Sequence, residues 1–287
     1  MRWSRRGVVG VLMAASAERA PAAQPPGPAI WEVRGPGGAR VLIFGDNPAQ
    51  RAPWRSARIE AAVRASRVFW KETPASGPDA WKLFVAKGVD AARPLSSWLT
   101  PSQRARVASA AATVGFRGAL ERYRPWLAAV LLEDRFNASA GFKAEDAPAH
   151  HLTAVAEAAG IPIHSEFPDI AAVVDYFADF SPAAEVGSLM RTVDDIEAGP
   201  EAAEREARAW AAGDLGPERA WVLRVRAAYP EYYRRILAER NRRWAVRIHD
   251  MLRRAETSFI LVGDAHLAGP DSVQRELARS GLTTRRA

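Results

Sequence analysis

The sequence has no cysteine and no long apolar run, and each absence removes a class of protein. Without cysteine there is no disulfide scaffold, no zinc–cysteine site and no thiol catalysis. A helix that spans a bilayer needs about 20 consecutive apolar residues. No segment of the 287 residues approaches that length. We therefore expect a chain without a stable membrane anchor that folds around its own hydrophobic core.

Lysine is scarce as well, and this affects how the net charge of the chain is interpreted. The 40 basic residues include only four lysines, so nearly all are arginine, and the formal net charge is +7. The arginines are scattered among acidic residues and form no basic stripe with interleaved aromatic residues. Because such a stripe is typical of a nucleic-acid surface, we expect no nucleic-acid partner.

The first residues have the features of an export signal. Arginines at the start precede a short apolar segment, Gly7–Ala15, and a small-x-small cleavage site at residues 15–17. Ser4–Val9 also resembles a twin-arginine signal, which exports folded cargo. We expect residues 1–17 to be a signal peptide and the protein to be exported, either periplasmic or secreted. The alternative is an ordinary cytoplasmic N-terminus.

The rest of the chain is expected to be a linker, residues 18–27, followed by one domain, residues 28–287. Strands alternate with helices at both ends of this domain, and residues 94–229 are mostly helical in pattern, as an insertion would be. The pattern predicts an α/β (α+β) fold with a central mixed β-sheet flanked by helices. The expected strands are Ile30–Val33, Ala39–Phe44, Val68–Glu72, Ile161–His164, Phe259–Val262 and Leu282–Thr284, and a long helix is expected from Pro230.

Two similar turns follow apolar strands near the two ends of the domain. One strand runs into Gly263-Asp-Ala-His266, and the other runs into Gly45-Asp-Asn-Pro48. Side chains at the carboxyl ends of buried strands project into the crevice above the sheet, where α/β proteins place their chemistry. The sequence therefore predicts that His266 and acidic residues of both turns share one pocket.

Several motifs occur together in a distinctive order. A Trp-containing hairpin is followed by a strand ending in glutamate, then by a long Arg-Asn helix, the Gly-x-x-His turn and a Gly-Pro pair. The residues concerned are Trp31, Glu72, Arg240, Asn241, Trp244, Gly263, His266, Gly269 and Pro270. This assembly resembles the TraB/GumN family, whose relatives include the Tiki metalloproteases, over residues 28–286. The resemblance implies a TraB/GumN-like (EreA/ChaN-like) fold.

The same resemblance implies an active site made of two Gly-x-x-His histidines and a glutamate. In the Tiki relatives these residues are thought to hold a divalent metal for peptide hydrolysis. The resemblance thus implies that His266 and Glu72 are catalytic and metal-binding. Arg240 and Asn241 are candidates to orient a substrate carboxylate or carbonyl, since arginine presents a planar fork of donors. Imidazole and carboxylate groups suit a first-row metal, here Mn, Co or Zn, whose bound water yields hydroxide near neutral pH. The expected substrate is a peptide or a small molecule.

One departure bears on this activity. Pro48 stands where the family has its first histidine, and its side chain has no ligand atom. Asp46 and Asp264 are oxygen donors that could complete a metal site instead. Two functions stay open: an exported metal-dependent hydrolase of peptidase type with an altered or inactive site, and a non-catalytic envelope protein that binds a peptide, glycan or small molecule. The sequence assigns no oligomeric state.

Further polar residues have alternative structural explanations. Glu166 and His164 are additional candidates for the crevice, since they lie on one face of a strand if the strand continues that far. His164 is otherwise a buried, hydrogen-bonded histidine, and Arg240 and Asn241 could equally tie their helix to the strand ends. Residues 192–210 are expected to form an acidic amphipathic segment with a solvated face. Its acids are Asp194, Asp195, Glu197, Glu201, Glu204 and Glu206.

Export is the first testable prediction. Residues 1–27, fused to a reporter that is active only outside the cytoplasm, should export it, because the basic start and apolar core are recognised by secretion machinery. Mass spectrometry of the exported fusion should place the new N-terminus after Ala17. Replacing both Arg5 and Arg6 with lysine should abolish export by the twin-arginine route only. A reporter that stays inactive in the cytoplasm would contradict the prediction.

Overall fold

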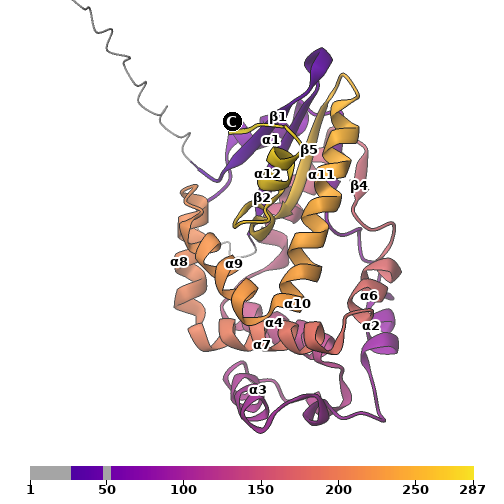
Figure 1. The fold of residues 1–287 in the computed structure, drawn as a ribbon, viewed down its shortest axis with the longest axis vertical. Coiled ribbons are helices and arrows are strands. Elements are labelled where there is room, and N and C mark those ends of the chain that lie inside the picture. The colour runs from indigo at the N-terminus through magenta and orange to yellow at the C-terminus, as the bar shows by residue number, and fades with distance from the viewer. Residues whose placement is uncertain (1–26, 48–52) are drawn as a thin grey trace, which may run out of the picture.

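Six strands form a mixed β-sheet in the computed structural model, which describes residues 27–47 and 53–287. The strands are β1 (Ile30–Arg34), β2 (Arg40–Asp46), β3 (Val68–Lys71), β4 (Ile163–Ser165), β5 (Thr257–Gly263) and β6 (Thr284–Arg286). Their order is β4-β3-β5-β2-β1-β6. β2, β5, β3 and β4 run parallel, whereas β1 runs antiparallel to β2 and β6. The predicted mixed sheet is confirmed (Figure 1).

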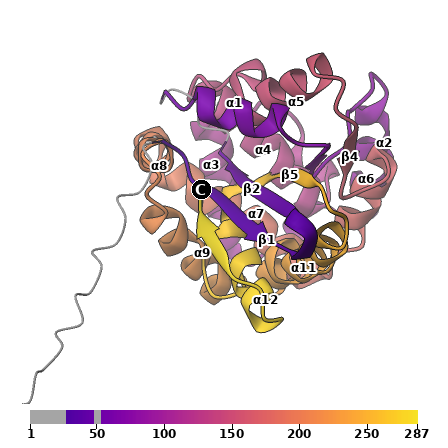
Figure 2. The ribbon, with the colours of Figure 1, turned by 90° about the horizontal axis from the view of Figure 1, so that it is seen from above.

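Successive strand residues point to opposite faces of the sheet, and here both sets of residues are apolar. In β2, Val41 and Ile43 pack into the core on one face, and Leu42 and Phe44 pack into the core on the other. The covering helices are α11 (Glu239–Leu252) and α12 (Val273–Arg279) on the first face, and α1 (Ala57–Arg64) and α5 (Pro148–Ala158) on the second (Figure 2). The sheet is therefore the middle of three layers.

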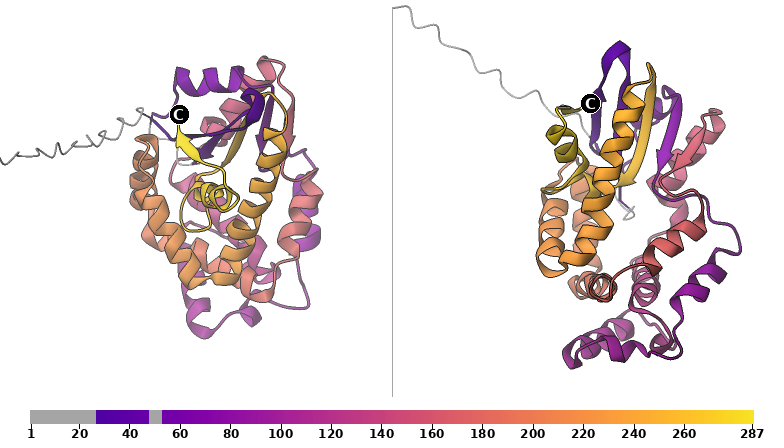
Figure 3. Two further views of the ribbon diagram at one scale, coloured as in Figure 1. Left: turned by 45° about the horizontal axis from the view of Figure 1, so that its top comes forward. Right: turned by 45° about the vertical axis from the view of Figure 1, so that its right-hand side comes forward.

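A group of helices lies beyond the carboxyl ends of the parallel strands (Figures 1 and 3). They are α2 (Ala80–Gly88), α3 (Pro101–Thr113), α4 (Pro125–Ser139), α6 (Ile170–Ala178), α7 (Pro182–Ala198), α8 (Pro200–Ala211) and α9 (Gly216–Ala228). Short turns of 3-10 helix link the elements at Pro36–Gly38, Leu95–Trp98, Leu120–Arg122, Ala144–Asp146 and Asp264–Leu267. Thr100 caps α3 as expected, in a reciprocal capping box with Gln103. Among the described helices, none is long and apolar enough to cross a bilayer.

A long helical segment connects this group to the sheet. It begins at Pro230, as the sequence predicts, with α10 (Pro230–Tyr233), passes through a π-helical turn at Arg234–Ala238, and continues as α11. A π turn inserts an extra residue into the helix and is frequent at functional sites. Here it lies just before Arg240 and Asn241, which are both buried although they are consecutive.

The prediction of one acidic segment over residues 192–210 is wrong. α7 ends at Ala198, Gly199 adopts a φ of 80°, and Pro200 begins α8. Glycine takes up a positive φ at little cost, and proline suits the first turn of a helix. The two helices leave this corner in different directions (Figure 1), so their acidic residues do not form one continuous face.

The close approach of the two Gly turns generates a stability prediction. A Cβ at Gly45 would lie 3.0 Å from the Cα of Asp264 and 3.2 Å from Cδ1 of Leu267. Because a backbone atom cannot move aside as a side-chain tip can, Gly45→Ala should destabilise the fold by about 1–3 kcal/mol in urea denaturation. Gly77→Ala is the control, since a Cβ there meets nothing within 4 Å. Equal stability of the two variants would mean that the turns do not approach so closely.

Candidate functional site

The carboxyl ends of four parallel strands bring the predicted residues to one edge of the sheet. In the pairing of β2 with β5, Asp46 lies opposite Gly263, the residue before Asp264. β3 joins the other side of β5 and ends just before Glu72, and β4 ends just before Glu166. The two Gly turns are thus adjacent, although more than two hundred residues separate them in the chain.

Arg240 is the central cation of this edge. Its Nη2 donates to Oε2 of Glu72 at 2.6 Å and to Oε2 of Glu166 at 2.5 Å, and its Nε donates to both oxygens of Glu166. Arg240 is 5% exposed. Burial alone would raise the pKa of Glu72, but the charge of Arg240 and the contact with His266 outweigh it and hold that pKa well below its usual range. Glu72 is therefore an ionised, paired carboxylate.

His266 is held in one tautomer by Asn241. The amide nitrogen of Asn241 donates to the carbonyl of Asp271 at 2.7 Å, so its amide oxygen faces Nδ1 of His266 at 2.5 Å. An amide oxygen only accepts, and Nδ1 must therefore carry a proton. Nε2 of His266 is left facing Oε1 of Glu72 at 3.6 Å. Oε1 also accepts a hydrogen bond from the backbone N–H of Gly263.

A small cavity of about 260 Å³ opens over these groups. Glu72, Arg240 and His266 contribute its charged and polar lining. Most of the remaining lining is apolar or aromatic: Phe167, Val173, Tyr176, Phe177, Trp221, Tyr232, Ile236 and Leu237. A few converging polar groups in an otherwise apolar cavity are typical of a site for a small ligand.

A second group of acids lies on the other side of the Gly turns. Asp264 accepts a hydrogen bond from Nδ2 of Asn47 at 2.7 Å and another from the carboxyl of Glu218. Burial raises the pKa of Asp264 to about 6 and raises that of Glu218 well above its usual range. Burial, with repulsion from Asp264 and Glu72, raises the pKa of Asp46 to about 7. These carboxyls therefore bind protons at a higher pH than Glu72 does.

The donors predicted for a metal are not gathered around one point. Within residues 27–47 and 53–287, no three histidine, aspartate or glutamate side chains are placed to hold an ion. Glu72 is bound to Arg240, and Asp264 is bound to Asn47 and Glu218. A dication beside a buried guanidinium would also be repelled by it. The arrangement of the described residues therefore does not fit a divalent metal.

The other sequence candidates have different surroundings. Glu166 belongs to the Arg240 ion pairs, with its side chain 5% exposed. His164 lies exposed on the edge strand β4, its ring stacked 4.8 Å from that of Trp70, and it is not part of the cavity lining. Pro48 lies outside the described residues. Glu218 has no distinguishing sign in the sequence, because acids are common in the first turn of any helix.

A family model described as the TraB/PrgY/gumN family matches residues 29–286, nearly the whole chain. Comparison with curated proteins and with solved structures gave no match.

Asp46 is the source of a pH prediction. Its pKa of about 7 in the folded protein exceeds the 3.8 of an ordinary aspartate, so its contribution to stability is complete below pH 4 and is lost as the pH rises through 7. Asp46→Asn should therefore raise the free energy of unfolding at pH 8 by roughly 4 kcal/mol, with little gain at pH 4. Urea denaturation at both pH values, with the exposed Asp134→Asn as control, measures this. A pH-independent effect of Asp46→Asn would contradict it.

Proposed function

The chain belongs to the TraB/PrgY/gumN family, and we propose that it is a non-catalytic binding protein whose cavity over Glu72, Arg240 and His266 holds a small ligand. The observation that carries this proposal is the buried guanidinium of Arg240, which pairs with Glu72 and Glu166 together. It already supplies the positive charge that a metal would bring to this edge of the sheet. Breaking such a buried pair is costly, so Glu72 is not readily released to coordinate an ion.

The lining of the cavity supports a class of ligand. Oε1 of Glu72, which faces Nε2 of His266 at 3.6 Å, accepts a further hydrogen bond from a ligand hydroxyl or amide N–H. Phe167 and Tyr176 supply aromatic surface beside it. A volume of about 260 Å³ suits one side chain or one sugar-sized group rather than an extended chain. A peptide end, a glycan unit or another small molecule with a donor group meets these conditions.

The second candidate is the metal-dependent hydrolase that the family resemblance implies. One observation favours it: the proton on Nδ1 of His266 points at Asn241, which is how metal-binding histidines are held by their neighbours. Asp46 also has a buried oxygen without a partner among the described residues. In this reading Mn, Co or Zn would be held by His266 with Glu72, Asp46 and Asp264, after a rearrangement that separates Glu72 from Arg240.

Either function is proposed for the cell envelope. The support is the arginine-rich, then apolar, character of residues 1–17 in the sequence. An exported binding protein would meet its ligand in the periplasm or outside the cell.

Metal binding separates the two candidates. We expect Mn, Co or Zn, each added at 1 mM, to leave the melting temperature unchanged. A metal that bound the folded protein with a Kd about a hundredfold lower than that concentration would instead stabilise it by about 2.7 kcal/mol. A rise in melting temperature that His266→Ala removes, and that the control His249→Ala keeps, would instead favour the hydrolase.

Substitution of Arg240 is a second test of the same two candidate functions. Arg240→Gln should destabilise the protein by about 3–5 kcal/mol near pH 7, because it removes the guanidinium from Glu72 and leaves Glu166 with only the longer contact to Arg243 at 3.4 Å. The variant, unlike the original protein, should then be stabilised by divalent metal, since two carboxylates and His266 become available together. An Arg240→Gln variant that stays as stable as the original protein would show that the ion pairs do not govern the site.

A further inference from the structure

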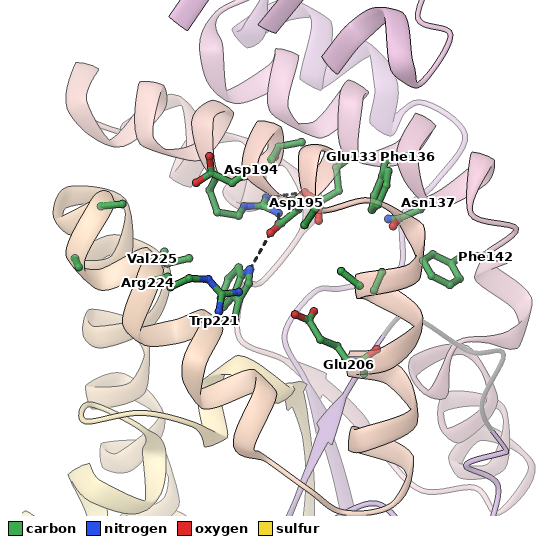
Figure 4. A pocket seen from close by; sticks show the side chains of 18 residues that line it. Glu133, Phe136, Asn137, Phe142, Asp194, Asp195, Glu206, Trp221, Arg224 and Val225 are labelled. Carbon is green, nitrogen blue, oxygen red and sulfur yellow. Dashed lines mark hydrogen bonds and ion pairs between the residues drawn. The ribbon is translucent and has the colours of Figure 1, made fainter. Parts of the chain in front are cut away.

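A second and larger cavity, of about 700 Å³, lies among the helices at the carboxyl ends of the strands (Figure 4). It is lined mainly by residues of α4, α7, α8 and α9, and its volume is that of a site for a small organic molecule. Trp221 lines this cavity and also the smaller one over His266. Glu72, Arg240 and His266 do not line it, so its chemistry is separate from the site already described.

Aromatic side chains lie on two opposite sides of the cavity. Phe136 and Phe142 lie on one side, and Trp221 lies across from them (Figure 4). Nε1 of Trp221 donates to Oδ1 of Asp195 at 3.0 Å, which fixes the orientation of the indole. Aromatic rings of fixed orientation attract both apolar groups and cations.

Most charges in the lining are already paired. Arg191 donates to Glu133 at 2.7 Å and to Asp195 at 3.0 Å, so two carboxylates share a single guanidinium. Asp194 is paired with Arg106 at 2.5 Å. The Arg191 group therefore retains one excess negative charge.

Glu206 is different from these acids. Its side chain extends from α8 into the cavity (Figure 4), and within residues 27–47 and 53–287 it makes no hydrogen bond or ion pair. Burial, with repulsion from Asp195, raises its pKa although Arg224 acts in the other direction. A half-buried carboxylate of this kind gains most from a positively charged partner. The sequence-based expectation of a solvated acidic face is therefore wrong for Glu206 and for Asp195.

One buried donor also lacks an acceptor. Arg191 is 9% exposed, and its Nε–H has no partner among the described residues. A buried N–H without an acceptor costs about 1–3 kcal/mol. Arg191 lines the cavity, and a small shift of its side chain would bring this covered N–H to a carbonyl or similar acceptor on a bound molecule.

We propose that this cavity binds a molecule that carries a protonated amine on an apolar body, with a hydrogen-bond acceptor beside the amine. Glu206 and Asp195 face the amine, Trp221 and the two phenylalanines contact the apolar body, and Arg191 faces the acceptor. Amino-acid amides and the N-terminal residues of peptides share this chemistry. The proposal is independent of the proposed function, because it uses neither His266 nor Arg240.

Calorimetry with phenylalanine amide on the purified full-length mature protein tests the proposal. N-acetyl-phenylalanine amide keeps the body and the acceptor but has no charge, and phenethylamine keeps the charge but has no acceptor. We expect phenylalanine amide to bind at least about tenfold more tightly than the acetylated compound, as expected for loss of one charge-assisted hydrogen bond. Phenethylamine should fall between them. Equal binding of the charged and acetylated compounds, or no binding of any, overturns the proposal.

Two variants locate the site. Glu206→Gln keeps the size of the side chain and should weaken phenylalanine amide about tenfold, whereas Glu204→Gln on the same helix, outside the cavity lining, should change it less than about twofold. Ala202→Phe should block binding, because Ala202 lines the larger cavity and not the smaller one. Binding that survives both Glu206→Gln and Ala202→Phe would place the amine elsewhere and refute the assignment. A peptide whose free N-terminus binds better than the amide would identify the source of the ligand.

Discussion

The buried guanidinium of Arg240 is the interaction on which the arrangement of this edge of the sheet depends. It joins α11 to Glu72 after β3 and to Glu166 after β4, which are groups from three distant parts of the chain. Arg240 suits this position because its planar fork of donors binds two carboxylates at once and stays charged when buried. The same ion pairs occupy the carboxylate that a metal would need. Stability and chemistry at this site are therefore set by one side chain.

The charge of Arg240 divides the acids of the site into two kinds. Glu72, which contacts the guanidinium, is held ionised, whereas Asp46, Asp264 and Glu218 are buried without a cation of their own and hold protons more tightly. The pKa values of the carboxyl groups therefore differ greatly between the two sides of the Gly turns. The larger cavity continues this pattern, since two of its carboxylates share one arginine and Glu206 is left without a paired group. The helices beyond the strand ends thus form an acid-rich cavity, next to a smaller one in which Arg240 pairs with Glu72 and Glu166 and Arg243 also contacts Glu166.

Much of the sheet could be predicted from the sequence, and much of the helical half could not. The strands around Val41 and Phe259 are short apolar runs bounded by glycine and proline, and such local signals specify an element without knowledge of its partners. Asp195 and Glu206 have surroundings that local sequence patterns do not specify. Acids at helical spacing are usually solvated, and only the packing of α7, α8 and α9 around a cavity makes these two partly buried. Glu218 was missed for the same reason, because its partner Asp264 comes from a turn elsewhere in the chain.

The sequence by itself determined the family, the mixed sheet and the order of the residues that follow its strands, because local patterns and short motifs carry that information. It also indicated that the two Gly turns belong together, since parallel strands end at the same edge of a sheet. Only the tertiary structure decided which charges are paired. Arg240 bonds to Glu72 and Glu166, His266 bonds to Asn241, and Glu206 bonds to neither arginine nor lysine among the described residues. The physical reason is that an ion pair depends on distances of a few ångströms, and those distances are set by how whole helices pack.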